Sequence, residues 1–197
     1  MWGHYTSTNL IDWEYKGVSL YPDQPFDCHG VYSGSAFLED GTMYLYYTGN
    51  VKLEDGDFDY INTGREANTV LATTKDGIHF GSKKELLRNS DYPSDLTCHV
   101  RDPKVWKKDD TYYMIQGART KNDVGQALIF ESSDKINWHF RSRVESKSLS
   151  VICGNARIIL KRTASKSFLP PSRAWKAKSG LTEMYTSPVT SLWTATF

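Results

Sequence analysis

Short runs in which aromatic or aliphatic residues alternate with polar residues fill the first 147 positions, and turn residues separate them. Two of these runs directly follow an Asp-Gly pair at 40–41 and an Asp-Asp pair at 109–110. An Asp-Gly pair between alternating runs is a strong signal of a β-hairpin, since glycine accepts the positive φ of a tight turn. No segment shows the 3.6-residue apolar period of a helix, and 52–66, with two glycines and several acids, is expected to be a long loop. The pattern predicts an all-β fold.

The alternating runs repeat along the chain with a period of about 70 residues. The glycine that ends the aromatic run recurs at Gly49 and Gly117, and the segments before these runs align Ser33 with Asp102. A further segment with a Ser or Thr, a turn residue, an aliphatic residue and an aromatic residue occurs three times, at 7–13, 74–80 and 133–138. Four antiparallel strands per repeat are typical of a β-propeller blade, whereas a β-sandwich gives no reason for an internal repeat.

We therefore expect residues 1–147 to form a partial β-propeller. It should contain the last strand of a first blade, to about Trp13, a complete second blade, and a complete third blade that ends near Phe140. Two complete blades cannot close a ring, so sheet edges should remain exposed.

The repeat also predicts where a site should lie. Successive blades are related by rotation about one axis, so equivalent positions face the same central funnel. Tyr32-Ser33 and Arg101-Asp102 stand at equivalent places in neighbouring repeats. These side chains should therefore converge.

The charge of the chain changes sign near position 148. Residues 1–147 hold 17 Lys and Arg against 22 Asp and Glu, net −5, whereas 148–197 hold 7 Lys and Arg against one acid, Glu183, net +6. The whole chain, at +1, gives no reason to expect binding to nucleic acid or to an anionic membrane. A basic tail alone could be a binding arm. It could equally be a segment that is not native coding sequence, and we expect 148–197 to form no domain.

Cysteine usage and hydropathy indicate a compartment. Three Cys at distant positions predict free thiols rather than a disulfide scaffold. No apolar run approaches the roughly 18 residues of a membrane-spanning helix, and the polar N-terminus shows no signal peptide. We expect a cytoplasmic protein.

The tripeptide Arg101-Asp102-Pro103 is the sharpest chemical signal. Pro103 should push Asp102 toward an extended conformation, and Arg101 should help to keep its carboxylate ionised. A buried carboxylate that faces a polyol can accept hydrogen bonds from two hydroxyl groups. A salt bridge at the start of a strand would explain the same residues.

Three weaker signals have structural alternatives. Tyr32 and Ser33, within Val31–Ala36, offer hydroxyl groups at the matching point of the preceding repeat, although a tight turn into a strand would use the same residues. Trp2 could present an aromatic face to a sugar ring or could pack on the first strand. Cys-His pairs at 28–29 and 98–99 suggest zinc, but their spacing of 70 residues fits no compact ligand pattern, so we expect no site there.

Several of these motifs, in this order, resemble glycoside hydrolase family 32, the β-fructofuranosidases. Trp2-Gly3-His4 followed by Ser7–Trp13 resembles the family pattern W-G-H-x-x-S-x-D-L-x-x-W, and 32–36 resembles [FY]-S-G-S-A. Residues 99–106 resemble H-F-R-D-P-K-V-W, in the form typical of bacterial sucrose-6-phosphate hydrolases. The resemblance covers about residues 1–147 and implies a five-bladed propeller followed by a β-sandwich.

The resemblance implies retaining hydrolysis of the fructosyl bond of sucrose, sucrose 6-phosphate or a fructo-oligosaccharide, by an enzyme that needs no cofactor and no metal. In such a mechanism an Asp attacks the anomeric carbon and a Glu protonates the leaving oxygen. Asp102 matches the aspartate that stabilises the transition state, and Arg101 matches the residue that orients it. Trp2, Tyr32 and Ser33 match positions that line the fructose pocket.

Two motifs of the family are missing from the chain. The nucleophile belongs to W-M-N-D-P-N-G, which should precede Trp2, and the acid/base Glu belongs to G-Y-M-W-E-C-P-D, expected near position 150. Codons allowed for Leu149–Ile158, when shifted by one base, spell F-G-Y-M-W-E-C-P-D. We interpret the segment from about 148 on as an out-of-frame translation, with a divergent basic tail as the alternative.

Two classes of function remain open at this stage. The first is a fragment of a fructoside hydrolase, expected to be inactive alone because it holds one catalytic carboxylate of three. The second is a non-catalytic, sugar-binding remnant of a propeller. A propeller glycosidase that acts on pentosides is a weaker third possibility.

Overall fold

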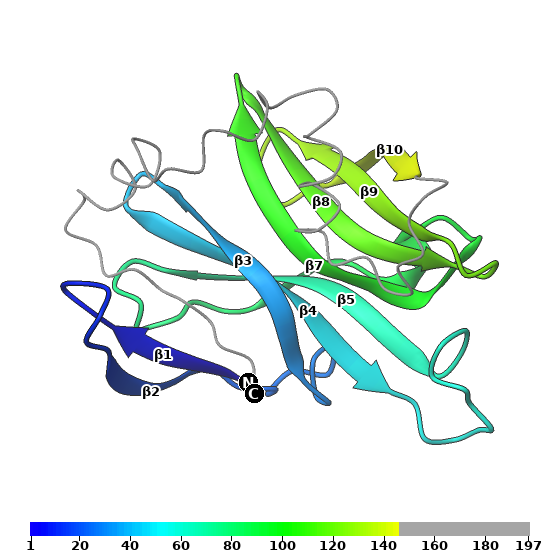
Figure 1. Cartoon of the computed structure of the whole chain (residues 1–197), viewed down its shortest axis with the longest axis horizontal. Coiled ribbons are helices and arrows are strands. Elements are labelled where there is room, and N and C mark those ends of the chain that lie inside the picture. Colours follow the sequence, from blue (N-terminus) through cyan, green and yellow to red (C-terminus); the bar gives the residue numbers. More distant parts are fainter. Residues whose placement is uncertain (146–197) are drawn as a thin grey trace.

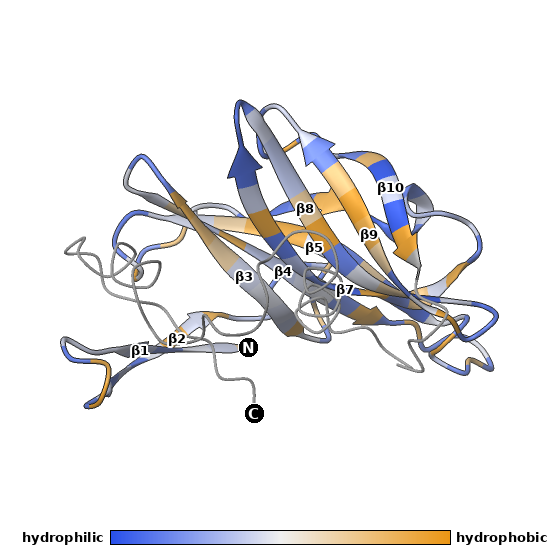
Figure 2. Cartoon of the chain, turned by 45° about the horizontal axis from the view of Figure 1, so that its top comes forward, coloured by the Kyte–Doolittle hydropathy of each residue, from blue (hydrophilic) through white to orange (hydrophobic). Residues whose placement is uncertain are grey.

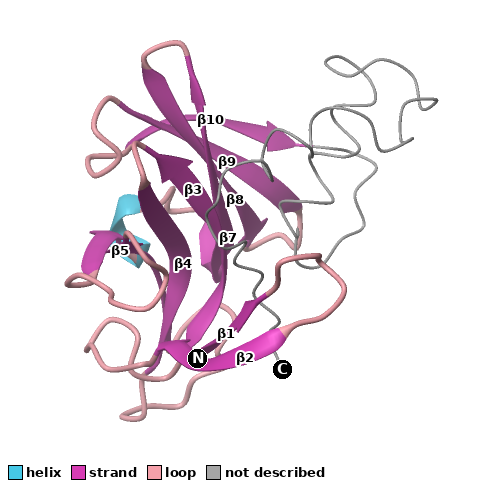
Figure 3. Ribbon diagram, turned by 90° about the vertical axis from the view of Figure 1, so that its left-hand side faces the viewer, coloured by secondary structure: helices cyan, strands magenta, loops and turns pink. Residues whose placement is uncertain are grey.

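The structure, a computed structural model, describes residues 1–145, which contain ten β-strands, one short 3-10 turn and no α-helix (Figures 1 and 3). The strands form a two-stranded hairpin and two four-stranded antiparallel sheets. Hydrophobic residues gather on the strands and hydrophilic residues on the turns (Figure 2). The predicted all-β fold is therefore confirmed, whereas the expectations for 148–197 lie outside the described residues.

The two four-stranded sheets share one simple topology. In each sheet the strands neighbour one another in chain order, and every pair is antiparallel. The first sheet consists of β3 (Val31–Glu39), β4 (Thr42–Lys52), β5 (Arg65–Thr74) and β6 (Lys84–Leu87). The second consists of β7 (Leu96–Lys108), β8 (Thr111–Thr120), β9 (Gly125–Ser132) and β10 (His139–Glu145). This is the blade that the repeat predicts.

The two blades meet through their first strands. Strand β7 contacts β3, β4 and β5 of the preceding sheet, and Figure 1 shows β7 beside β3 near the middle of the molecule. The 3-10 turn η1 (Asn89–Asp91) lies in the connection between the sheets. Since the first strand of every blade lies nearest the axis of a propeller, β3 and β7 are the strands that should carry the site.

The remnant of the first blade is larger than predicted. It consists of two strands, β1 (Trp2–Thr6) and β2 (Glu14–Leu20), whereas the sequence indicated a single strand that ends near Trp13. Trp13 lies in the turn before β2. The register of the hairpin shifts twice, and Gly17 within β2 has a φ of +101°. These irregularities break the alternation by which a strand is recognised in sequence.

The tight turns between the first two strands of each blade are as expected. Asp40 and Gly41, with φ values of 50° and 69°, connect β3 to β4. Asp109, with a φ of 54°, begins the turn between β7 and β8. The long loop predicted between Lys52 and Glu66 is also present, from 53 to 64.

The repeated Ser/Thr segments are turns rather than strands. In each, a hydroxyl oxygen accepts two backbone N–H groups, and the Asn or Asp two residues later accepts two more. The hydroxyls belong to Ser7, Thr74 and Ser132, so the third copy begins one residue before the predicted Ser133. Side-chain acceptors of this kind replace the backbone partners that a turn lacks.

Two hydrophobic clusters hold the parts together. One lies between the two blades and includes Tyr46, Met114 and Phe130, all fully buried. The other joins the β1–β2 hairpin to the first four-stranded sheet through Trp2 and Tyr47. This packing holds the first four-stranded sheet, which includes β3, against the second sheet on one side and the β1–β2 hairpin on the other. The candidate site lies on β3 and β7.

Candidate functional site

Both inner strands carry a bulge at the same place. On β3, Val31 pairs with Gly49 and Gly34 with Tyr47, so two residues, Tyr32 and Ser33, stand opposite Thr48. On β7, Arg101 pairs with Gly117 and Lys104 with Ile115, so Asp102 and Pro103 stand opposite Gln116. A bulge redirects side chains and commonly occurs beside active sites.

The matching bulges correct the sequence alignment of the two repeats by one residue. Tyr32, and not Ser33, is the structural counterpart of Asp102, because each is the first extra residue of its bulge. The alignment of Ser33 with Asp102 that the sequence suggested is therefore out of register by one residue. A one-residue slip matters because it reverses the face toward which a strand side chain points.

Asp102 is not extended, in contrast to the prediction. Its φ of 58° lies in the left-handed region, although a following proline favours extended backbone. The bulge removes Asp102 from the ladder, and its N–H instead donates to Oγ1 of Thr48 at 3.1 Å. Thr48 belongs to the neighbouring blade, so this hydrogen bond fixes the Asp102 backbone across the interface between the sheets. The half-buried Asp102 is therefore placed by the packing of two blades.

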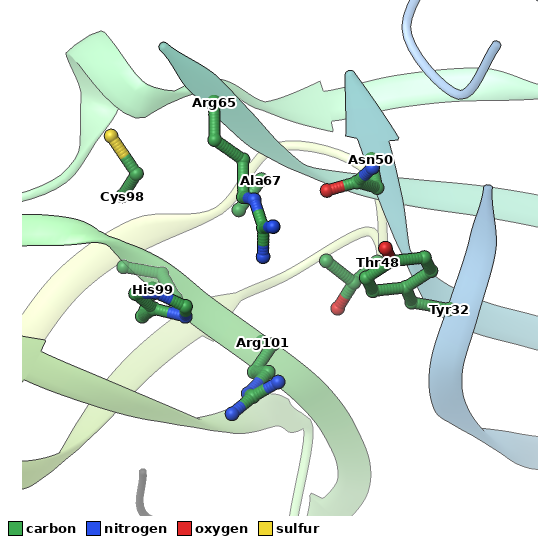
Figure 4. A pocket seen from close by; sticks show the side chains of 9 residues that line it. Tyr32, Thr48, Asn50, Arg65, Ala67, Cys98, His99 and Arg101 are labelled. Atoms are coloured by element: carbon green, nitrogen blue, oxygen red, sulfur yellow. The ribbon is translucent and has the colours of Figure 1, made fainter. Parts of the chain in front are cut away.

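A polar recess opens beside these bulges (Figure 4). The space within it, about 220 Å³, includes open solvent, and it is bounded by parts of β3, β4, β5 and β7. The lining residues are Tyr32, Thr48, Asn50, Arg65, Ala67, Cys98, His99, Val100 and Arg101.

Two of the residues singled out from the sequence line this recess together. Tyr32 comes from the bulge of β3 and Arg101 from the residue before the bulge of β7, as the rotation between repeats predicts. Asp102 directly follows Arg101 and donates its N–H to Thr48, another lining residue. Ser33 is exposed and does not line the recess.

Trp2 lies behind the recess rather than in it. Its side chain is only 2% exposed and packs edge-on against Tyr47, with ring centroids 6.0 Å apart. The indole Nε1–H donates to the carbonyl oxygen of Tyr32 at 2.9 Å. Trp2 therefore holds the backbone of Tyr32 in place, and within residues 1–145 its ring is a packing surface.

Four polar residues of the recess were not predicted as site residues: Thr48, Asn50, Arg65 and His99. Thr48 and Asn50 flank Gly49 near the end of an aromatic strand. Polar residues within an otherwise apolar strand were the one sequence feature that could have indicated them as site residues. The sequence offered His99 as a possible zinc ligand and as the first residue of the segment that resembles H-F-R-D-P-K-V-W, but with no role in binding a sugar. Arg65 follows the variable 53–64 loop and has no counterpart in the repeat, so the sequence pattern offers no signal for it.

The electrostatic character of the recess is positive. Arg65 and Arg101 line it, and no carboxylate is among the lining residues. Burial lowers the pKa of His99, and the charges of Arg101 and Arg65 lower it further. Figure 4 shows Arg65 extending into the space between His99 on one side and Tyr32 and Thr48 on the other. The recess therefore offers many hydrogen-bond donors and a positive field to a ligand.

The pairs of Cys and His form no metal centre within residues 1–145. Cys28 and His29 contact each other, with 3.2 Å between Sγ and Nδ1, whereas Cys98 and His99 belong to the recess. No group of three or more His, Cys, Asp or Glu side chains suited to a metal ion occurs in this part of the chain. Nor does it contain a helix long and apolar enough to cross a membrane.

Comparison with known sequences identifies close similarity over the described part. The family model described as "Glycosyl hydrolases family 32 N-terminal domain" matches residues 1–155. The sucrose-6-phosphate hydrolase of Bacillus subtilis is 42% identical over 139 residues, which are 71% of this chain and 27% of that protein. The raffinose invertase of Escherichia coli is 41% identical over 138 residues, which are 70% of this chain and 28% of that protein.

Solved structures agree with the sequence matches. A sucrose-6-phosphate hydrolase from Lactobacillus gasseri superposes with a TM-score of 0.66 at 30% identity, over 77% of this chain and 30% of that chain. A variant of a family GH32 β-fructofuranosidase from Bombyx mori, in complex with sucrose, gives 0.63 at 33% identity, over the same shares. The predicted partial propeller is thus confirmed. The chain spans less than a third of the length of these relatives.

Proposed function

Because the chain belongs to glycosyl hydrolase family 32, we propose that it is part of a retaining hydrolase that cleaves the fructosyl bond of sucrose or sucrose 6-phosphate. The names of its relatives support both substrates, since they include sucrose-6-phosphate hydrolases and a raffinose invertase. The partner is then a small sugar, and neither nucleic acid nor a membrane takes part. An intracellular sugar phosphate as substrate would place the protein in the cytoplasm.

The matching bulges of β3 and β7 are the observation that carries this proposal. They bring Tyr32 and Arg101, which come from motifs at equivalent places in the two repeats, to one recess, and Asp102 directly follows Arg101 in its bulge. A packed core residue or a simple strand-start salt bridge would not need a bulge repeated in both blades. Within residues 1–145, Arg101 forms no salt bridge at all.

Asp102 is proposed as the transition-state stabiliser. An ionised carboxylate accepts hydrogen bonds from sugar hydroxyls, and these bonds strengthen as positive charge develops on the fructosyl ring. The Thr48 hydroxyl that accepts the Asp102 N–H holds the carboxylate in place before the substrate arrives. Arg101 orients the carboxylate, Tyr32 and Ser33 contact the fructosyl unit, and Trp2 positions Tyr32.

The remaining chemistry needs carboxylates that the 197 residues do not offer in the matching motifs. Retaining hydrolysis requires a nucleophile that forms the glycosyl–enzyme bond and an acid that protonates the leaving oxygen. Neither W-M-N-D-P-N-G nor G-Y-M-W-E-C-P-D occurs in the sequence. We therefore propose that the described blades supply one wall of the catalytic site and that the chain alone does not hydrolyse sucrose.

The proposal also includes a change of reading frame near position 148. We infer that 148–197 are an out-of-frame translation, on the grounds of the charge reversal and of the codons compatible with F-G-Y-M-W-E-C-P-D. The nucleotide sequence across codons 145–160 and its flanks tests this directly. A second frame that encodes the missing motif is expected, and a flank without it in any frame would remove the inference.

A gene whose reading frame is restored near codon 148, and which is extended upstream through the W-M-N-D-P-N-G motif, allows the function to be measured. We predict that its product releases fructose from sucrose or sucrose 6-phosphate and that Asp102→Asn lowers kcat by about 100-fold or more, because it removes a charge that acts in the transition state. Asp109→Asn, in the exposed turn of the same hairpin, is the matched control and should leave kcat unchanged. Full activity of the Asp102→Asn enzyme would refute the assigned role.

A further inference from the structure

Hydroxyl groups of the preceding sheet bind the bulge of β7 at both of its extra residues, Asp102 and Pro103. The N–H of Asp102 donates to Oγ1 of Thr48 at 3.1 Å. The carbonyl oxygen of Pro103 accepts the hydroxyl of Ser35 at 2.8 Å. Backbone groups that a bulge removes from the ladder need other partners when they lie inside a protein. Here both partners belong to another sheet, Ser35 to β3 and Thr48 to β4.

Two bound ends leave the backbone of Asp102 little freedom. The peptide bond between Asp102 and Pro103 is planar, and the proline ring fixes the φ of Pro103. Between the bound N–H and the bound carbonyl, only the φ and ψ of Asp102 and the ψ of Pro103 can still turn. The φ of Asp102 is 58°, a left-handed value that persists where surrounding contacts hold it. Since the Cα–Cβ bond follows the backbone, the same two contacts set the direction of the carboxylate.

The strand that carries Ser35 is itself packed against the second sheet. Ser35, Phe37 and Glu39 lie on one face of β3, because side chains alternate along a strand. The ring of Phe37 packs edge-on against Tyr112, with centroids 5.9 Å apart, and the carboxylate of Glu39 accepts the Tyr112 hydroxyl at 2.7 Å. The Ser35 hydroxyl is therefore presented to β7 by a face that is held in place.

The strand opposite the bulge is bound to the same sheet. Gln116 stands opposite the two extra residues and is fully buried, and its Nε2 donates to Oγ1 of Thr69 at 2.9 Å. The hydroxyl oxygens of Thr69 and Tyr92 lie 2.8 Å apart, and the Tyr92 hydroxyl donates to the carbonyl oxygen of Ala67 at 3.2 Å. When the Thr69 hydroxyl donates to Tyr92, the three bonds run in one direction and strengthen one another. Strands β3, β4 and β5 thus each bind the region of the bulge.

The other bulge is held in a similar way. The carbonyl oxygen of Tyr32, an extra residue of the β3 bulge, accepts the indole Nε1–H of Trp2 at 2.9 Å. Trp2 belongs to β1, just as Ser35, the donor to Pro103, belongs to β3. In both cases a side chain from the preceding unit donates to a carbonyl oxygen of a bulge that carries proposed site residues.

From these contacts we propose that Ser35 is a positioning residue, which acts through the carbonyl group of Pro103 to hold the Asp102 carboxylate in its catalytic direction. The inference rests on the proposed function, since it assigns a task to a further residue of the same site. It also gives a role to the second serine of the motif at 32–36, which the proposed function leaves without one. Thr48 holds one end of the Asp102-Pro103 pair, and Ser35 holds the other.

The first test uses the 197-residue chain, which contains all of these contacts. Hydrogen exchange of the Asp102 backbone amide is followed by NMR in the parent chain and in Ser35→Ala. We expect exchange at Asp102 to become about 10-fold faster, because one lost hydrogen bond eases local opening by about that factor. The amide of Ile129, in the interior strand β9, should exchange at the parent rate.

Two variants separate the hydroxyl group from general effects of substitution. Ser35→Thr keeps the hydroxyl and should retain most of the protection of the Asp102 amide. Ser82→Ala, which changes an exposed serine in the loop before β6, should exchange as the parent chain does. An unchanged rate at Asp102 in Ser35→Ala would overturn the proposal. Equal acceleration at Asp102 and Ile129 would also overturn it, because Ser35 would then act on the stability of the whole fold.

The second test uses the enzyme with its reading frame restored and its upstream motif included. Ser35→Ala should lower kcat about 10-fold and leave KM within about twofold, because it disturbs a group that acts in the transition state. In the Asp102→Asn background the same substitution should cause no further loss of kcat, since the charge that Ser35 positions is already absent. Equal loss in both backgrounds would show that Ser35 does not act through Asp102.

The outcomes keep the two proposals apart. A restored enzyme that releases no fructose, together with faster exchange at Asp102 in Ser35→Ala, would refute the proposed function and leave the placement of Asp102 by Ser35 intact. An active enzyme whose kcat is unchanged by Ser35→Ala would remove this inference and leave the proposed function intact.

Discussion

Thr48 supplies the hydroxyl that accepts the N–H of Asp102, and the two residues belong to different blades. Thr48→Val keeps the shape of the side chain but leaves that N–H without its acceptor. We expect the free energy of unfolding to fall by about 1–3 kcal/mol, the cost of an unsatisfied buried donor. Urea denaturation of the purified chain measures it, and Thr48→Ser, which keeps the hydroxyl, should lose much less. Equal stability of the Val and Ser variants would show that this hydrogen bond does not hold Asp102.

Single residues were predictable where a motif names them and not where packing decides. Tyr32 and Arg101 were expected to converge because motifs at equivalent places in a repeat face the same axis, and both line the recess. The left-handed backbone of Asp102 was missed because the local preference before Pro103 was overridden by a bulge and by a hydrogen bond from another blade. Trp2 was one of the residues proposed to contact the sugar, but its side chain is buried in the core. Whether a tryptophan is buried depends on neighbours far away in sequence, which the local pattern does not show.

The contact between the two blades contains a cluster of charges centred on Glu39. Its carboxylate accepts hydrogen bonds from Nζ of Lys107 at 2.9 Å and from the hydroxyl of Tyr112 at 2.7 Å, and it also binds Lys135. The hydrogen bond from Lys135, followed by those from Lys107 and Tyr112, lowers the pKa of Glu39 to about 2. Glu39 belongs to β3, and its three partners belong to the following blade or its turn.

This cluster predicts how stability depends on pH. A carboxyl group whose pKa is lower in the folded than in the unfolded chain stabilises the fold above its unfolded pKa, 4.5, and the contribution is lost as the pH falls toward 2. Glu39→Gln should therefore destabilise the chain at pH 7, by about 1–3 kcal/mol, and the difference should shrink between pH 4.5 and 2. Denaturation of both chains across this range tests it, with Glu54→Gln in the exposed loop as control. A difference independent of pH would contradict the assignment.

Elements were predicted well where their alternation is regular. The hairpins at 40–41 and 109–110 follow from turn residues that accept positive φ. The second strand of the first blade was missed because Gly17 and two register shifts disturb its pattern. The repeated Ser/Thr segments were recognised in sequence, but only their hydrogen bonds show that they are side-chain-capped turns and that the third begins at Ser132.

At the scale of the molecule, the repeat determined the architecture. Two copies of a four-strand unit predict two blades related by rotation, and the structure and its relatives agree. The repeat therefore predicts that the two blades lie side by side around one axis. It does not predict the recess that contains Arg65 and Asn50, because that recess is formed by residues of four different strands. The recess of the described blades is lined by two arginines, and the bulge beside it holds one proposed catalytic carboxylate. Hydrolysis is therefore proposed to depend on acids that the chain does not supply in the family's motifs.

The most direct test of this account is the release of fructose from sucrose and from sucrose 6-phosphate by the purified 197-residue chain, measured beside its Asp102→Asn variant. The account predicts no release above the enzyme-free background by either protein, because double displacement needs a nucleophile and an acid in addition to Asp102. Release by the parent chain that disappears in the Asp102→Asn variant would contradict it, since these blades would then hold a complete catalytic site.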